Sequence, residues 1–595
     1  MMIHIFKRPL RFARFLPVLA MPLVAACAQS GTVQSAASAS GTVTVGIIAL
    51  NDFHGALEPQ KTAVLIPAEG EGGVKPVPAG GAAFLASAVD SVRGQYTYSA
   101  TVAAGDMTGA SQISSSLFLD EPAVGVLNRI GLDFTSVGNH EFDSGTDELL
   151  RKQAGGCAQF TAQKPCQVEP FGGAKYRYLA ASTRRADGST LFPATGIKTF
   201  GKGRRAVKVG FIGLTLKGTP SLVSPDGIKG LTFADEADTI NAEAPRLRAA
   251  GADVVVVLIH EGGYTSGKPN PSGCENLTGP IKGVIDRLAP GVDVVISGHT
   301  HWSYVCDYAT INPRQPILLT SAGVSGQLIT DITLQIDPVA SRVVSKRARN
   351  VIVQSDPYQS PRGPVDEAKE LPRFTARPDV AAYVGKYREA ANAYALRPVG
   401  SLGGPADRAP SAGFPNQGGP AGNLIADAQL AATAGAGAQI AFMNPFGIRK
   451  PIAPEPDGSV NFGAIYAAQP FNNTLITQSM TGAELKAVLE QGFDDEGPKQ
   501  VLTPSAGFSY AIDLSRPVGS RVVTMTLGGA PIDPAATYRV TTNSFLAGGG
   551  DSFSLFNRQR DAVIGISDLS ALEAWLKAVP PRAVPTEDRV KRVGG

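Results

Sequence analysis

Five of the six histidines in this chain occur in four short polar motifs, and each motif follows an apolar run rich in β-branched residues. The motifs are ALNDFHG, SVGNHEFD, VVLIHEGG and ISGHTH, and they contain His54, His140, His260, His299 and His301. Histidines that serve only as packing residues would not collect in this way, whereas imidazole ligands of a metal centre would. The spacing therefore predicts a metal site.

The motifs, together with a Gly-Asp pair at residues 105–106, supply more donor groups than one ion requires. Four imidazoles, two carboxylates and one amide suit two ions that share a carboxylate. The expected ligands are Asp52, His54, Asp106, Asn139, His260, His299 and His301. Any one of these motifs alone is more often structural, but five motifs in one order favour a centre with two divalent ions. Oxygen and nitrogen donors of this kind accept Zn, Mn, Co or Fe according to supply.

Regular elements place these motifs. Apolar runs that predict strands lie at 43–50, 101–104, 134–137, 209–214, 253–259 and 292–297, and helical patterns lie at 80–92, 122–130 and 235–250. Near-continuous apolar strands are buried on both faces, which is typical of layered α/β folds. Because active sites in such folds form at the carboxyl ends of strands, we expect the polar motifs to converge on one cleft.

Length and composition limit the remaining possibilities. A chain of 595 residues is too long for one core and should form two or more domains. Its formal net charge is only +3, without a basic block, which argues against a nucleic-acid polymer as partner. We expect a monomer.

The N-terminus is typical of an exported protein. Residues 1–27 combine a basic start with a short apolar run, as in a signal peptide, and end in Val24-Ala25-Ala26-Cys27. This ending resembles a bacterial lipoprotein box with Cys27 as the lipidated residue, although ordinary cleavage at a small residue is the alternative. Residues 28–42 then form a flexible tether rich in Ser, Ala and Gly. We expect a periplasmic protein with a lipid anchor in the outer membrane.

Four cysteines remain after Cys27. An even number in an exported chain indicates disulfides. We expect Cys157–Cys166 and Cys274–Cys306, and the other two pairings of the four stay open. Oxidised cysteines cannot supply thiolate ligands, so the metal centre must use nitrogen and oxygen donors.

The series of motifs resembles the calcineurin-like metallophosphoesterase signature, and more narrowly the periplasmic 5′-nucleotidase/UDP-sugar hydrolase branch. This resemblance covers nearly all of residues 43–580. It implies a four-layer α/β/β/α metallophosphoesterase domain joined by a linker helix to a smaller α/β substrate-binding domain. By the same resemblance, one ion takes Asp52, His54 and His301, the other takes Asn139, His260 and His299, and Asp106 bridges them.

The remaining histidine of the motifs, His140, resembles the family's catalytic histidine, paired with Asp143. An aspartate at this spacing would fix one tautomer of the ring and favour its protonated form beside a phosphate. We expect His140 to stabilise charge on the phosphoryl group or its leaving oxygen; the alternative is a purely structural histidine. In the expected reaction, a hydroxide formed between the two ions attacks phosphorus in line.

The character of the sequence changes after residue 350. We expect the metallophosphoesterase domain at 43–355, a linker and interdomain helix at 356–397, and the C-terminal substrate-binding domain at 398–585. The helix is predicted by helical spacing of apolar residues, closed by a proline. The residues in this pattern are Val380, Tyr383, Val384, Tyr387, Ala391, Tyr394 and Pro398.

The resemblance supplies five substrate-binding candidates in the C-terminal part: Asn444, Arg449, Phe471, Phe545 and Asp551. Arg449 would bind a phosphate, the two phenylalanines would sandwich a nucleobase, and Asp551 would accept hydrogen bonds from ribose. The alternative for the phenylalanines is a place in the core.

One departure from the family pattern affects this site. Gln417 stands where animal relatives have an arginine. Either one contact with the phosphate or ligand is missing, or Arg408, which lies earlier in the chain, supplies that contact.

These patterns predict an exported dinuclear phosphohydrolase. Its substrates would be nucleoside 5′-monophosphates, with UDP-sugars and other nucleotide pyrophosphates in the same range, and its products nucleoside and phosphate. The first alternative is an esterase of the same fold with another substrate. It would be a 2′,3′-cyclic-nucleotide phosphodiesterase/3′-nucleotidase, or it would hydrolyse a sulfur ester. A catalytically silent binding protein is the second alternative, against which the full set of ligand residues argues.

Overall fold

The computed structural model describes residues 41–594 except 69–72, 162, 224, 267–268, 361–362, 409–416, 472 and 496–498. The predicted signal peptide, Cys27 and nearly all of the predicted tether lie outside these described residues.

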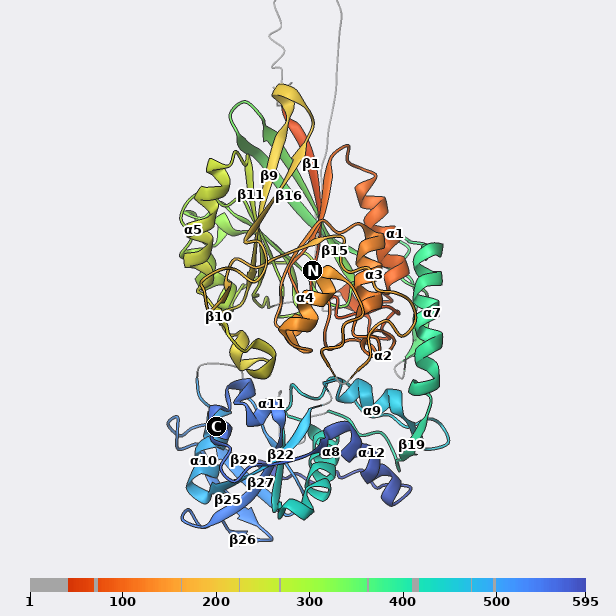
Figure 1. Cartoon of the computed structure of the whole chain (residues 1–595), viewed down its shortest axis with the longest axis vertical. Helices are drawn as coiled ribbons and strands as arrows, with labels where there is room; N and C mark the ends of the chain where they lie inside the picture. The colour runs from red at the N-terminus through yellow and green to blue at the C-terminus, as the bar shows by residue number, and fades with distance from the viewer. Residues whose placement is uncertain are drawn as a thin grey trace, which may run out of the picture. The chain divides into compact units, whose positions relative to one another are not determined.

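Two six-stranded sheets form the centre of the N-terminal part (Figure 1). The first has the order β16 (Arg342–Ile352), β15 (Leu328–Asp337), β1 (Val43–Leu50), β4 (Ser99–Ala103), β5 (Phe134–Ser136), β6 (Arg177–Leu179). The second has the order β13 (Ser303–Asp307), β14 (Leu318–Ala322), β12 (Val294–Ser297), β11 (Val254–His260), β9 (Val207–Thr215), β8 (Thr195–Phe200). All six strands predicted from apolar runs are confirmed, with ends that differ by one or two residues.

Strand register explains why the polar motifs converge. In the first sheet β1, β4 and β5 are parallel, and Leu50 at the end of β1 pairs with Ala103 at the end of β4. In the second sheet β11 and β12 are parallel, and Ile259 pairs with Ser297. Parallel strands in this register end side by side, so the residues that follow them emerge at one edge of each sheet.

Helices cover the outer faces of both sheets. Helices α1 (Ala82–Arg93) and α3 (Glu121–Ile130) pack on the first sheet, while α5 (Glu236–Ala249) and α6 (Pro280–Asp286) pack on the second (Figure 1). The three helices predicted between the strands are thus confirmed. A separate apolar cluster that includes Val45, Val102, Val209, Val256 and Ile332 fills the space between the sheets. The predicted α/β/β/α order of layers is confirmed.

The predicted interdomain helix is α7 (Pro378–Ala395). Its stripe of Val380, Tyr383, Val384, Tyr387 and Ala391 is buried in the core formed with α1 and α3. Tyr394 belongs to the same sequence pattern, yet it is 60% exposed and meets the edge of Phe462 at a ring-centroid distance of 6.4 Å. The stripe leaves the core one turn before the helix ends.

The C-terminal part contains two larger sheets, in addition to the two-stranded sheet of β19 (Pro398–Ser401) and β21 (Ser459–Asn461). One has the order β23 (Thr503–Pro504), β20 (Ile440–Met443), β27 (Thr537–Asn543), β22 (Thr474–Thr481), β28 (Val563–Ser567), and the other β26 (Ala530–Pro531), β25 (Val522–Leu527), β24 (Phe508–Asp513), β29 (Val590–Gly594). The helices of this part are α8 (Gly419–Ala432), α9 (Phe462–Ala468), α10 (Gly482–Gln491), α11 (Ser544–Ala547) and α12 (Asp568–Ala578).

Both expected disulfides are present. Cys157 bonds to Cys166 and Cys274 to Cys306, with Cα–Cα distances of 5.6 and 5.3 Å. Among the described residues, no helix has the length and apolar character needed to cross a membrane.

Candidate metal centre

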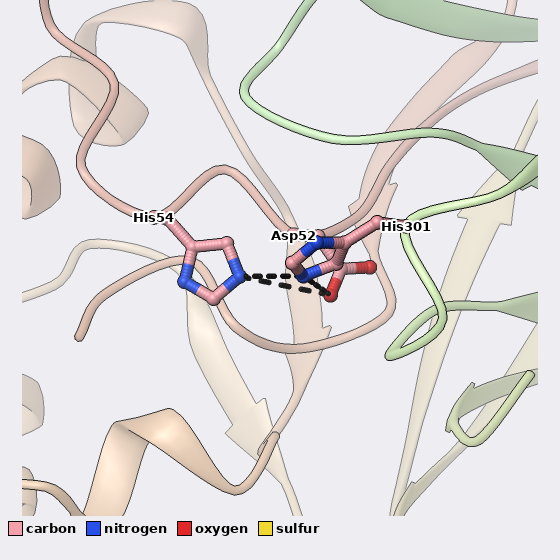
Figure 2. A group of neighbouring side chains, drawn as sticks. All are labelled: Asp52, His54 and His301. Carbon is pink, nitrogen blue, oxygen red and sulfur yellow. Dashed lines mark hydrogen bonds and ion pairs between the residues drawn. The ribbon is translucent and has the colours of Figure 1, made fainter. Parts of the chain in front are cut away.

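Three predicted ligands meet at the end of β1. Donor atoms of Asp52, His54 and His301 lie within 4.8 Å of one another, and these residues form one candidate metal group. The Nε2 atoms of His54 and His301 are 3.1 Å apart, and Asp52 Oδ1 is 3.8 Å from the first and 3.5 Å from the second (Figure 2). The aspartate and both rings thus point at one small volume.

A second group forms at the ends of β4 and β11. Donor atoms of Asp106, His260 and His299 also lie within 4.8 Å of one another. The Asn139 side-chain oxygen is 3.1 Å from His260 Nε2, so the structure brings this amide to the same group. All seven expected ligand residues are therefore gathered at the edge where the strands end.

The Asp106 carboxylate connects the two groups. Its Oδ2 atom is 3.0 Å from His260 Nε2 in one group and 3.8 Å from His54 Nε2 in the other. Its Oδ1 atom accepts a hydrogen bond of 2.9 Å from the backbone N–H of His140. One oxygen is thus occupied by the backbone, which leaves the other to face both groups.

The backbone at these positions adopts an uncommon conformation. Asp52, His54, Asp106, His299 and His301 all have positive φ, between 49° and 69°. Non-glycine residues rarely adopt this region, and such strain collects at functional sites that the surrounding structure fixes. Here the strand ends supply that fixation, and the turn directs each side chain back over the edge of its sheet.

Tautomers of two histidines fit metal binding. His54 Nδ1 lies 2.9 Å from the carbonyl oxygen of Gly109, and His260 Nδ1 lies 2.8 Å from that of Ala104. A carbonyl oxygen can only accept a hydrogen bond, so in both rings Nδ1 must be the donor and carry the proton. The lone pair of Nε2 then faces the centre. This second contact is the usual way in which a protein orients a histidine ligand.

The charges also fit a cationic ligand. Burial lowers the pKa of His54 and of His299 to about 3 and that of His301 well below its usual value, so these three rings are neutral. Burial raises the pKa of Asp52 to about 7, and the charge of Asp106 adds to that shift. His260 differs from the other three, because burial opposes its charged form but the Asp106 carboxylate 3.0 Å away raises its pKa to about 10. Three neutral imidazoles beside two carboxylates are a donor set that favours divalent cations.

His140 stands apart from both groups and pairs with Asp143. Its Nδ1 atom lies 3.1 and 2.9 Å from the two carboxylate oxygens of Asp143. Burial opposes the charged form, yet the carboxylates of Asp143 and Asp106 raise the pKa of His140 above its usual value. The ring also stacks on Phe471, with centroids 5.8 Å apart and planes inclined by 14°.

Sequence reasoning missed two residues that hold the centre in place. The buried carboxylate of Glu141 accepts hydrogen bonds from the backbone N–H groups of Asp106, Met107, Thr108 and Gly138, at 2.6–3.2 Å. Asn51 donates to Asp52 Oδ2 at 2.8 Å and to the carbonyl of Gly323 at 2.6 Å. Both residues lie inside the polar motifs. A carboxylate or an amide at the buried end of a strand could have indicated in the sequence that these side chains bond to the backbone of the centre.

The five substrate-binding candidates lie in two groups of neighbouring residues: Asn444, Phe545 and Asp551 in one, and Arg449 and Phe471 in the other. Asn444 donates to Asp551 at 2.7 Å, and the Phe545 ring lies so close to Gly550 that a Cβ there would be 2.5 Å from it. The Arg449 guanidinium lies 5.9 Å from the centroid of Phe471. Both phenylalanines are only half-buried, which separates them from the core phenylalanines of this domain.

A cavity of about 970 Å³ lies between His54 and His301 on one side and Arg408, Arg449 and Lys450 on the other. Burial, together with repulsion from Arg449, lowers the pKa of Arg408 and of Lys450. Gln417 is only 5% exposed, and Arg408 rather than Gln417 lines this cavity. The upstream arginine is thus the one placed to contact a ligand, and the cavity favours an anion.

The fold and the paired donor groups define a metallophosphoesterase. The sequence model of the calcineurin-like phosphoesterases matches residues 46–303, and that of the 5′-nucleotidase C-terminal domain matches residues 399–558. The chain matches both models and belongs to the 5′-nucleotidase family.

Two longer bacterial proteins are similar to most of this chain. The chain is 29% identical over 555 residues to endonuclease YhcR of Bacillus subtilis, which covers 92% of the chain and 41% of that protein. It is 29% identical over 567 residues to cell wall protein Lmo0130 of Listeria monocytogenes, which covers 88% of the chain and 66% of that protein. The chain thus spans less than two thirds of the length of either relative.

Among solved structures, the 5′-nucleotidase precursor of Thermus thermophilus has the same fold. It superposes with a TM-score of 0.69 at 24% identity, over 92% of this chain and 99% of that one.

Gly138 provides a test of the centre. A Cβ at this position would lie 2.1 Å from Asp106 Oδ1 and 2.5 Å from the Asp106 backbone nitrogen. We expect Gly138→Ala to displace the carboxylate that faces both groups, and so to lower metal affinity and turnover by about 10- to 100-fold. Metal content per chain after gel filtration, with phosphate release, measures this.

The matched control is Gly283→Ala in α6, where a Cβ would meet nothing within 4 Å. This variant should keep the metal content and activity of the parent. A Gly138→Ala protein with unchanged metal content and turnover would show that the Asp106 position does not govern the centre.

Proposed function

We propose that this chain is an exported dinuclear phosphohydrolase that converts nucleoside 5′-monophosphates to nucleoside and phosphate. The observation that carries the proposal is one oxygen of Asp106, which belongs to one three-residue donor group and also faces the other. One ion would be held by Asp52, His54 and His301, the other by Asn139, His260 and His299, with Asp106 shared. Two divalent ions in such a site supply Lewis acidity toward phosphoryl oxygens and lower the pKa of a bound water.

His140 is the residue that we assign to the chemistry itself. Asp143 holds the Nδ1 side of the ring, so the proton on Nε2 is free to hydrogen-bond an oxygen of the reacting phosphate. The raised pKa of His140 favours the cationic form of the ring, which suits stabilisation of charge on the leaving 5′-oxygen.

The C-terminal residues are proposed to hold the nucleotide. Arg449, with Arg408 beside it in the cavity, would bind phosphate oxygens through its planar guanidinium. Phe471 and Phe545 would stack on the base, and Asp551, oriented by Asn444, would accept hydrogen bonds from the ribose hydroxyls. UDP-sugars and related pyrophosphates present the same phosphate and nucleoside groups and belong to the proposed range.

A substrate panel tests the function. We expect phosphate release from AMP, lower rates with 2′,3′-cyclic AMP, UDP-glucose and NAD, and loss of all activity after chelation with recovery on addition of a divalent metal. Activity that survives complete metal removal would exclude the dinuclear mechanism. A higher kcat/KM for 2′,3′-cyclic AMP than for AMP would favour the cyclic phosphodiesterase instead.

The role of His140 has its own test. His140→Ala should lower kcat by about 10²- to 10⁴-fold while metal content stays at that of the parent, because the ring touches the reacting phosphate and not the ions. Asp143→Asn should have a smaller effect of the same kind. The control is Asp147→Asn, an exposed aspartate in the first turn of α4 (Thr146–Ala154), which should change nothing. A His140→Ala enzyme with normal metal content and normal kcat would remove His140 from the mechanism.

Export and anchoring by Cys27 are also proposed. Support comes from the two disulfides, which persist in oxidising compartments, and from the similarity to a relative named as a cell wall protein. In a Gram-negative host, the parent should be found in the outer-membrane fraction and Cys27→Ser should not. Equal distribution of the two proteins between membrane and soluble fractions would contradict lipidation.

A further inference from the structure

A cluster of basic residues lies at the end of the N-terminal part where β1 begins. Three of them belong to the turn between β8 and β9, one to the start of β9 and one to the start of β16: Lys202, Arg204, Arg205, Lys208 and Arg342. All five side chains are exposed, and residues 201–208 contain no aspartate or glutamate. We call these five residues the basic end.

The two turns that carry the basic end are held together by the buried carboxylate of Asp253. One of its oxygens accepts a hydrogen bond of 2.7 Å from the backbone N–H of Lys208. The other accepts a hydrogen bond from the hydroxyl of Ser341, in the turn before β16. Val43 at the start of β1 pairs with Ile336 near the end of β15. The first strand therefore begins beside the turn that leads to Arg342 (Figure 1).

Much of this positive charge is not neutralised within the protein. Among the residues that the structure describes, none of Lys202, Arg204 and Arg205 forms an ion pair. The two carboxylates of the same end are Asp253, which bonds to Lys208 N–H and Ser341, and Asp337, which lies near Arg342. The turn between β8 and β9 thus presents three cations to solvent, and such a surface attracts an anionic partner.

The turn between β15 and β16 adds an apolar tip to this surface. Val339 is 89% exposed and stands between Pro338 and Ala340. Asp337 Oδ1 accepts hydrogen bonds from the N–H groups of Val339 and Ala340 at 2.9 and 3.0 Å, which holds the turn in one conformation. Apolar side chains beside basic ones suit the boundary between lipid head groups and acyl chains.

The basic end lies near the predicted anchor and far from the metal centre. Only residues 28–42 separate Cys27 from β1, and fifteen residues span at most about 50 Å when fully extended. Asp253 directly precedes β11 and His260 ends it, so the basic end and the centre lie at opposite ends of one strand, about 23 Å apart. A surface that contacts the basic end would therefore leave the centre free.

We propose that the basic end docks on an anionic lipid surface beside the anchor and holds the metal centre facing away from the membrane. The basic side chains contact the head-group phosphates, and Val339 enters the boundary beneath them. This rests on the proposed function in one respect, the anchor at Cys27, while the charge and the exposed valine act without it. Each basic residue near an anionic surface strengthens binding by about five-fold.

Sedimentation with vesicles tests this surface without the anchor. The processed chain with Cys27→Ser, which carries no lipid, should bind vesicles of phosphatidylglycerol mixed with phosphatidylcholine but not vesicles of phosphatidylcholine alone. The combined changes Lys202→Glu, Arg204→Glu and Arg205→Glu should lower the partition coefficient by about 10- to 100-fold. Phosphate release from AMP in solution should stay at the parental rate, because these side chains are exposed and far from the centre.

The matched control reverses three exposed charges away from the basic end: Lys369→Glu, Arg388→Glu and Lys591→Glu. The partition coefficient should change by less than about two-fold, because charges farther than a Debye length from the lipid are screened.

Equal partition of the two triple variants would overturn the proposal, as would equal binding to both kinds of vesicle. Duplex DNA that binds the chain more tightly than the phosphatidylglycerol vesicles would also overturn it, since the partner would then be a nucleic acid. If fractionation of Cys27→Ser excludes lipidation, vesicle binding that is lost in the Lys202, Arg204 and Arg205 variant still supports the basic end. A chain that binds the vesicles in this way yet hydrolyses no AMP contradicts the proposed function alone.

A probe at the apolar tip tests which face of the protein docks. In the Cys27→Ser chain the remaining cysteines are all in disulfides, so Val339→Cys supplies a single thiol for a polarity-sensitive dye. Its emission should move to shorter wavelength when phosphatidylglycerol vesicles bind. The same dye at Val518→Cys, a position in the C-terminal part that is 49% exposed in the parent, should not respond. Equal shifts at the two positions, or no shift at Val339→Cys while the chain is bound, would overturn the proposed orientation.

Discussion

The position of one buried carboxylate governs the arrangement of the whole centre. Asp106 gives one oxygen to the His140 backbone and faces His260 and His54 with the other. The Glu141 carboxylate holds the loop of Asp106 by accepting hydrogen bonds from four backbone N–H groups. Gly138 packs so closely on Asp106 that a Cβ at this position would clash with it. Because this carboxylate belongs to one donor group and also faces the other, a small displacement of the loop would change the spacing between the two groups.

The strand ends stabilise a local conformation that the residues would not adopt alone. Five of the ligand residues have positive φ, at a cost of the order of 1 kcal/mol or more each. Sheets with buried faces on both sides can support this strain, because their register is fixed by packing on helices and on each other. The layered fold therefore serves as a rigid frame, and the turns after its strands carry the ligands.

The electrostatics separate the functions of the two halves of the chain. The N-terminal half gathers imidazoles and carboxylates, which favour cations, and the C-terminal half supplies Arg408, Arg449 and Lys450, which favour the anion that such cations bind. His140 lies where the two meet, paired with Asp143 and stacked on Phe471. A site divided in this way needs both parts of the chain before it is complete.

The sequence by itself determined the residue types of the centre, their place after strands, the layered fold and the burial of most of α7, because periodicity and apolar runs report local structure and burial. It left the disulfide pairing and the choice between Gln417 and Arg408 open. Long-range packing settled both, along with the exposure of Tyr394 and the anchoring roles of Glu141 and Asn51. The reason is physical: these properties depend on distances between residues far apart in the chain, such as the 247 positions that separate His54 from His301. Sheet register and packing set those distances, and no local pattern encodes them.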